Sequence, residues 1–275
     1  MLPGRLTLGL LLAPALLVLG VGAGPPSAPA VAAAASVRHG QAEPAIASTH
    51  TRTAFSEVRL AAHVIGQSVD GRPILAYHRF RADEGWARTV VVIGQMHGDE
   101  TAGRDVVHRM LRGALPRHLD LWVIVSMNPD GYAAGRRQNA HQVDLNRNFP
   151  WSWRRTSSRS STYSGPRAGS EPETAAVMAF LAAVDPRTVV SIHQPLDGVD
   201  AYHAKRPALT RALSRATGLP VKVFSCDGGC HGTLTQWLDN TEAGAAITVE
   251  LPRHPGTALL GRVASGSLRV LAAGT

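Results

Sequence analysis

The chain has 275 residues, of which 44% are hydrophobic, so it can bury the core of one large catalytic domain or of two small ones. Its formal net charge is +8, but the arginines are scattered and few aromatic residues lie among them, which argues against a nucleic-acid-binding surface. The basic character suits attraction to an anionic cell-wall polymer or to an acidic substrate, and charge alone does not choose between the two.

The first 36 residues have the pattern of a secretory signal peptide. Arg5 provides a positive start, residues 6–21 are apolar, and a stretch of small residues with several candidate cleavage sites follows. The apolar run is shorter than the roughly 20 residues that a membrane span needs, so cleavage is favoured over an uncleaved anchor. We therefore expect a secreted or cell-wall-associated protein with no stable membrane span. Residues 37–52 are polar and aperiodic, which predicts a linker before a single domain of residues 53–275.

The rest of the chain alternates between strand and helix patterns. Strands are predicted at residues 58–69, 73–80, 89–93, 121–125, 189–192 and 247–251, the first two joined by a turn at Asp70-Gly71. Helices are predicted at residues 101–112, 170–184, 207–217 and 257–273, with a capping box of Ser170 and Glu173 and a stop at Gly218. This alternation indicates an α/β fold with a mostly parallel or mixed sheet that helices cover.

Three of the predicted strands run into reactive side chains. The strand at residues 89–93 is followed by His97 and Glu100, and the strand at residues 189–192 is followed by His193. The strand at residues 247–251 carries Glu250. Ligands of α/β folds bind at the carboxyl ends of strands, and catalytic zinc sites typically use three His or carboxylate ligands. An H-x-x-E pair is common by chance, and a lone histidine on a strand is more often a packed core residue. The shared position at strand ends nevertheless favours a metal site of His97, Glu100 and His193.

A second polar region spans residues 128–150 and contains the segments NPDGY and DLNRNFP. Its proline, glycine and asparagine residues predict a loop rather than a helix or strand. An arginine in such a loop can bind a carboxylate through two parallel hydrogen bonds, and a neighbouring asparagine can bind the same group. The alternative for an isolated arginine is a surface ion pair.

The chain has two cysteines, Cys226 and Cys230, separated by an aspartate and two glycines. In an exported protein such a pair predicts a disulfide. The alternative is half of a metal site, for which the adjacent His231 would be a poorly placed ligand.

Together these segments resemble the zinc carboxypeptidases of the carboxypeptidase A type, peptidase family M14, and most of all its short bacterial members that cleave peptidoglycan peptides. HGDE resembles the first zinc motif, VVSIH the strand of the third ligand, NPDGY and VDLNRNFP the region that binds the substrate carboxylate, and TVELP the strand of the general base. The resemblance runs from about residue 58 to the C-terminus. It implies a single-domain α/β/α sandwich with a mixed sheet of roughly eight strands.

The resemblance also assigns roles by position. His97, Glu100 and His193 would hold one zinc ion, and Glu250 would be the general base. Arg137 would stabilise the oxyanion, with the adjacent Arg136 as a rival, while Asn146 and Arg147 would bind the free carboxylate of the substrate.

One departure from the family concerns the tyrosine that usually closes over the substrate from a loop before the base strand. Tyr202 is the last tyrosine of this chain and follows His193 too closely to match. The corresponding stretch offers His231, Thr233 and Gln236 instead, so a tyrosine contact with the substrate is in doubt.

The expected function is that of a secreted zinc metallocarboxypeptidase that hydrolyses an amide bond next to a free carboxylate. Its substrate would be a peptide with a free C-terminal carboxylate, either in ordinary proteins or in the diaminopimelate-bearing stem peptides of peptidoglycan. One alternative is a zinc deacylase of the aspartoacylase type, acting on N-acyl amino acids. Another is an inactive protein that binds the cell wall.

Overall fold

The computed structural model describes residues 57–226 and 230–274. The predicted signal peptide of residues 1–36 and the predicted linker of residues 37–52 lie outside the described residues. Both therefore stay predictions.

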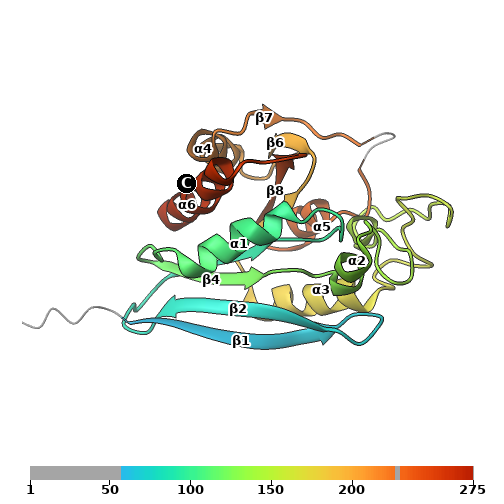
Figure 1. Ribbon diagram of the computed structural model, residues 1–275, viewed down its shortest axis with the longest axis horizontal. Helices are drawn as coiled ribbons and strands as arrows, with labels where there is room; N and C mark the ends of the chain where they lie inside the picture. Colours follow the sequence, from blue (N-terminus) through green and yellow to red (C-terminus); the bar gives the residue numbers. More distant parts are fainter. Residues whose placement is uncertain (1–56, 227–229, 275) are drawn as a thin grey trace, which may run out of the picture. The chain divides into compact units, whose positions relative to one another are not determined.

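A mixed sheet of eight strands in the order β1-β2-β4-β3-β5-β8-β6-β7 forms the centre of the described chain (Figure 1). The strands are β1 (Val58–Gln67), β2 (Pro73–Arg81), β3 (Arg88–Ile93), β4 (Leu119–Ile124), β5 (Thr188–His193), β6 (Leu196–Asp200), β7 (Val221–Lys222) and β8 (Ala245–Pro252). The four central strands β4, β3, β5 and β8 run parallel, while β1, β2 and β6 pair antiparallel to their neighbours toward the centre. The carboxyl ends of β3, β5 and β8 therefore meet at one edge.

Helices cover both faces of this sheet. They are α1 (Ala102–Arg112), α2 (Pro129–Ala134), α3 (Pro172–Val184), α4 (Pro207–Thr217), α5 (Leu234–Thr241) and α6 (Thr257–Ala273), with a short 3-10 turn at Leu145–Arg147. One buried apolar cluster joins α1, α4 and α6 to one face of the sheet, and a second joins α3 and α5 to the other. In Figure 1, α4 and α6 lie side by side. The fold is the predicted α/β/α sandwich.

The alternation of side chains along β3 explains why its last four residues, 90–93, are all apolar. Val90 and Val92 pack into the cluster with α1 and α6, whereas Val91 and Ile93 pack into the cluster with α3. Successive residues of a strand point to opposite faces, so a strand covered by helices on both sides needs an unbroken apolar run.

The predicted helices and strands are present, with bounds that differ by a few residues at most. The hairpin turn is closed by a hydrogen bond from the Ser68 amide to the Arg72 carbonyl, and Gly71 has the positive φ of 77° that such turns require. Gly218 ends α4 in the left-handed conformation, as predicted.

The predicted capping box of Ser170 and Glu173 is wrong. The N-cap residue of α3 is Glu171, and it makes no side-chain capping bond. The Ser170 hydroxyl donates to Glu171 instead, and the Glu173 carboxylate accepts from the Val69 amide and from Asn139. Tertiary partners have displaced the local capping interaction, because these buried carboxylates need donors from elsewhere in the chain.

Several short elements were not predicted. Residues 128–150, expected to form a loop, contain α2 and the 3-10 turn, and β6, β7 and α5 lie in segments without a strong pattern. The side chain of Asn128 caps α2 by accepting from the Gly131 amide, which gives this six-residue helix its start. Among the helices of the described residues, none has the length and apolar character that crossing a membrane requires.

Gly98 lies in the loop after β3, where it packs against α2. A Cβ at this position would lie 2.0 Å from the Gly131 carbonyl carbon and 2.3 Å from the Tyr132 nitrogen. Its φ is not positive, so the reason for a glycine here is the close approach of two backbones.

We expect Gly98→Ala to destabilise the protein, because the backbone atoms of Gly131 and Tyr132 leave no room for a methyl group. The free energy of unfolding should fall by at least about 2 kcal/mol, and the melting temperature by roughly 4–8 °C. Gly85→Ala is the matched control, since no atom lies within 4 Å of its Cβ position. Equal melting temperatures for the two variants in a thermal scan would contradict this packing.

Candidate functional site

The candidate site lies at the sheet edge where β3, β5 and β8 end. His193 is the last residue of β5, and the parallel register pairs it with Glu250 on β8. A cavity of about 240 Å³ opens there, several times the roughly 30 Å³ that one water molecule occupies in the liquid. The seven residues to which the resemblance assigns a metal-binding, catalytic or substrate-binding role all line this cavity: His97, Glu100, Arg137, Asn146, Arg147, His193 and Glu250.

His97, Glu100 and His193, which we call the metal group, converge on one point. The Glu100 carboxylate oxygens lie 2.7 Å from His97 Nδ1 and 3.0 Å from His193 Nδ1, and the two Nδ1 atoms are 3.2 Å apart. Within the described residues, these three form the one group of histidine, cysteine and acidic side chains that could hold a metal ion. Three atoms bound tetrahedrally to one Zn²⁺ at about 2.0–2.1 Å stand roughly 3.3 Å apart, so the donor set and its spacing fit that ion.

Each histidine of this group is oriented by a second partner on its other ring nitrogen. His97 Nε2 lies 3.1 Å from Asp144 Oδ1, and His193 Nε2 lies 2.9 Å from Ser191 Oγ. Such partners fix the ring orientation and leave Nδ1 free to face the metal position. Ser191 lies two residues before His193 on the same strand face, and this spacing could have identified it from the sequence. The role of Asp144 could not be read from spacing, because it is 47 residues from His97.

The charges of the group act strongly on one another. Burial by itself would lower the pKa of His97, but the carboxylates of Glu100 and Asp144 outweigh it and raise the pKa to about 9. Burial opposes ionisation of the two carboxyls as well, yet the positive charge of His97 leaves the pKa of each far below its ordinary value.

Arg137 lies between the metal group and Asp144. Its guanidinium donates from Nη2 to Asp144 Oδ2 at 2.8 Å and from Nη1 to Glu100 Oε1 at 3.4 Å. The neighbouring Arg136 is exposed and does not line the cavity. Of the two arginines, the structure therefore places only Arg137 where it could face a reacting carbonyl oxygen.

Glu250 faces the metal group from the neighbouring strand. It is 8% exposed, and burial raises the pKa of its carboxyl group. Its Oε2 accepts a hydrogen bond of 3.2 Å from the Leu196 amide, and no other described residue donates a hydrogen bond to its carboxylate. A half-desolvated carboxylate of this kind is suited to taking and returning a proton.

Asn146 and Arg147 line the wall that leads away from the metal group. The Asp144 carboxylate accepts from the Asn146 amide, and Asn146 Oδ1 accepts from the Leu234 amide at the start of α5. Burial lowers the pKa of the Arg147 guanidinium, which is partly desolvated. It donates to the Asn146 carbonyl at 2.7 Å and retains further N–H groups that can bind an anion in the cavity.

The loop that carries these residues is held by buried amide side chains. Asn139 donates to both Glu171 and Glu173, at 2.8 and 3.0 Å, and accepts from the Val143 amide. Asn148 donates to the Ser164 carbonyl at 2.8 Å. A buried polar network of this kind is stabilising only when its members are satisfied together, so it fixes one conformation of the loop.

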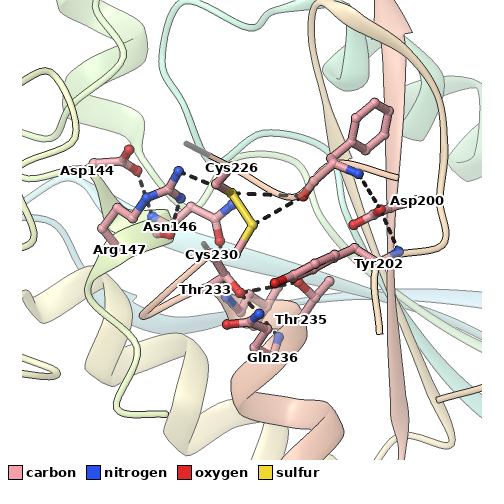
Figure 2. Close-up of a disulfide and its surroundings, with 12 residues drawn as sticks. Asp144, Asn146, Arg147, Asp200, Tyr202, Cys226, Cys230, Thr233, Thr235 and Gln236 are labelled. Atoms are coloured by element: carbon pink, nitrogen blue, oxygen red, sulfur yellow. Dashed lines mark hydrogen bonds between the residues drawn. A yellow bond between two sulfur atoms is a disulfide. The ribbon is translucent and has the colours of Figure 1, made fainter. Parts of the chain in front are cut away.

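The predicted disulfide between Cys226 and Cys230 is present, and it forms part of the cavity wall. Figure 2 shows the Arg147 guanidinium directed toward it, and Arg147 Nη2 lies 3.7 Å from Cys226 Sγ. The three residues between the cysteines lie outside the described residues.

The structure also locates the residues that could take the place of the missing loop tyrosine. Thr233 and Gln236 line the cavity, whereas His231 does not. Tyr202, which the sequence places too close to His193 for the loop position, lines the same cavity from the chain after β6. A tyrosine is therefore present at the site, but it comes from a different part of the chain.

Comparison with known proteins gives one family match. Residues 51–196 match the family described as zinc carboxypeptidase, which covers the three metal-group residues and the loop but ends before Glu250. Murein peptide amidase A from Vibrio campbellii is 35% identical over 199 residues, which are 68% of this chain and 77% of that protein. Murein peptide amidase A from Escherichia coli is 30% identical over 200 residues, covering 68% and 79% of the two chains.

Solved structures show the same fold. Murein-tripeptide amidase from Escherichia coli superposes with a TM-score of 0.61 at 29% identity, over 78% of this chain and 90% of that one. Carboxypeptidase A from Helicoverpa armigera superposes with a TM-score of 0.67 at 18% identity, over 78% and 69%. At the latter identity the likeness concerns the fold alone.

We expect zinc binding to be coupled to the loss of a proton from His97. A metal binds the neutral imidazole, whereas the pKa of about 9 means that this ring is protonated at neutral pH. Affinity for zinc should therefore rise by about tenfold per pH unit between pH 6.5 and 8.5. Competition with a chelator of known pH dependence measures it, and an affinity that does not change over this range would contradict the protonated state of His97.

Proposed function

Because this chain belongs to the zinc carboxypeptidase family, we propose that it hydrolyses the amide bond next to a free carboxylate in murein peptides. The protein is a zinc metallopeptidase by family. The observation that carries the proposal is the pairing of a His-Glu-His group with Glu250 on the neighbouring strand, at one end of a cavity whose wall carries Arg147.

In this proposal His97, Glu100 and His193 hold the zinc ion. When bound, zinc polarises a substrate carbonyl and lowers the pKa of a water molecule toward neutrality. Asp144 and Ser191 orient the two histidine rings, which favours binding of the ion.

Glu250 accepts the proton of the attacking water and returns it to the leaving amine. Its position on β8 brings the carboxylate to the same cavity wall as His193, which is its partner in the strand register. The raised pKa of its carboxyl group moves it toward the working pH, where a general base is most effective.

Arg137 stabilises the negative charge that develops on the carbonyl oxygen. Its bonds to Asp144 and Glu100 hold the guanidinium in place, so little reorganisation is needed when that charge forms.

Asn146 and Arg147 bind the free carboxylate of the substrate. A carboxylate bound by the Arg147 guanidinium places only the adjacent amide bond near the metal group, which restricts cleavage to that bond. The half-buried position of Arg147 strengthens the ion pair relative to one in water.

The choice of murein peptides rests on the relatives and on the expected export. The two relatives that match over most of this chain's domain are murein peptide amidases. The signal-peptide pattern of residues 1–36 and the net charge of +8 fit an enzyme that works outside the cell on an anionic polymer.

We expect Glu250→Gln to abolish turnover of a diaminopimelate-bearing stem peptide while leaving zinc content and melting temperature close to those of the parent protein. The amide keeps the shape of the side chain but cannot accept the proton of water. Glu242→Gln, outside the cavity, is the matched control. Near-normal kcat in Glu250→Gln, measured by mass spectrometry of the products, would show that the base lies elsewhere.

We expect Arg147→Ala to reduce kcat/KM on the free-acid peptide by at least about 30-fold, since a buried charged hydrogen bond to the substrate is lost. The already slow cleavage of the C-terminal amide should barely change, because the amide carries no negative charge. Arg136→Ala controls for loss of positive charge at an exposed position nearby. Equal rates on acid and amide in the parent protein would rule out carboxylate recognition, and release of acyl groups from N-acyl amino acids alone would favour a deacylase.

A further inference from the structure

The helices α1, α4 and α6 form one layer on the same face of the sheet, with α6 between the other two (Figure 1). Their buried residues pack against the sheet, and their exposed residues make up the outer surface of this layer. None of those exposed residues lines the cavity that contains the metal group. A partner on this surface would therefore leave the cavity open.

The exposed positions of the three helices carry arginine or small residues almost throughout. The arginines, which we call the arginine face, are Arg109 and Arg112 of α1, Arg211 and Arg215 of α4, and Arg262 and Arg269 of α6. In these three fully described helices the one exposed acidic residue is Asp105, and every other exposed residue is alanine, serine, threonine or proline. The outer surface of a helix normally mixes both signs of charge, and this one does not.

The positive charge of the arginine face has no counter-charge within the fold. No acidic side chain among the described residues forms an ion pair with any of these six arginines. Arg211 and Arg215 are four residues apart on α4, and Arg109 and Arg112 are three apart on α1, so like charges are neighbours on each helix. An anion from outside the chain would relieve this repulsion.

The charges of neighbouring helices also lie close together. Arg262 Nε of α6 is 3.8 Å from the Cβ position of Gly218, which ends α4 three residues after Arg215. Arg109 and Arg269 line one cleft of about 390 Å³ between α1 and α6. The arginine face is therefore a continuous basic surface across three helices rather than a set of isolated charges.

The chemistry of this surface fits a linear polymer that carries a phosphate in each repeat unit. A guanidinium group binds a phosphate through two parallel hydrogen bonds, and several such contacts on one chain add up to firm binding. The floor of the cleft consists largely of small residues, among them Gly113, Gly261, Ala264 and Ser265. It has room for the uncharged part of a repeat unit between two phosphates.

An anionic membrane is the other phosphate-bearing surface that such a face could meet. Proteins that dock on membranes through a basic helix usually insert tryptophan, phenylalanine or leucine side chains beside the charges. Among the described residues, the large hydrophobic side chains that are exposed all lie outside α1, α4 and α6. The surface thus favours a hydrated polymer over a lipid bilayer.

We infer that the arginine face binds a linear phosphate-bearing polymer of the cell wall, of the poly(glycerol phosphate) type, and so retains the protein there. The inference goes beyond the proposed function, because it concerns where the protein is held rather than which bond it cleaves. It is also independent of that function, since the arginines lie outside the cavity. The expected export of the chain would bring it to such a polymer.

The test titrates the full chain with poly(glycerol phosphate) and compares two triple variants. The first combines Arg109→Ala, Arg215→Ala and Arg269→Ala, one from each helix. The second combines Arg59→Ala, Arg136→Ala and Arg155→Ala, which removes the same charge from exposed positions outside the three helices. Alanine favours helix, so the first variant should fold, and a thermal scan together with unchanged turnover of a soluble stem peptide checks it.

The first triple variant should bind the polymer at least about tenfold more weakly than the parent protein, and the second should stay within about threefold. Binding should also weaken with salt, because each phosphate contact releases counterions. Between about 50 and 200 mM salt, the slope of log Kd against log salt concentration should be smaller by about two in the first variant.

Three outcomes would overturn the inference. The parent protein could fail to bind the polymer at low salt, or both triple variants could lose affinity equally, which would mean that net charge rather than this face controls binding. The first variant could instead keep its affinity for the polymer and lose affinity only for phosphatidylglycerol vesicles, which would make the face a membrane-docking surface. Polymer binding by a protein that cleaves no stem peptide would contradict the proposed function alone.

Discussion

The buried carboxylate of Asp144 is the contact on which the geometry of the site depends. It is fully buried, and its two oxygens meet His97, the Arg137 guanidinium and the Asn146 amide. A buried charge is strongly destabilising unless it is paired and hydrogen-bonded, so these partners are constrained to remain around it. One side chain thereby sets the orientation of His97, of Arg137, and of the loop that carries Arg147.

The second constraint is the register between β5 and β8. The parallel pairing of His193 with Glu250 brings a metal-group residue and a carboxylate to the same level of the sheet edge. A shift of one residue would turn every side chain of one strand to the opposite face of the sheet, where it would meet the other apolar cluster, and would separate His193 from Glu250. Core packing therefore also fixes the distance between the groups that we propose to bind the metal and to move the proton.

These two constraints concentrate charge in a small volume, and the rest of the loop region compensates for it. Asn139 and Asn148 satisfy buried carboxylates and carbonyls around the loop, and Gly98 allows the loop after β3 to lie directly on α2. The disulfide lines the cavity next to Arg147.

The sequence by itself determined the class of fold, most strands and helices, and the identity of the residues that gather at the site. It could do so because strands buried on both faces are continuous apolar runs, and because polar residues that interrupt such runs at their ends are conspicuous in a family with fixed motifs. Only the tertiary structure decided which of Arg136 and Arg137 faces the cavity, that Asp144 orients His97, and that His193 lies level with Glu250. These facts depend on contacts between residues far apart in the chain and on strand register. Neither long-range contacts nor strand register leaves a local pattern in the sequence. The capping box predicted at Ser170 is wrong for the same reason, because the side chains of Ser170 and Glu173 bond to other partners in the folded chain.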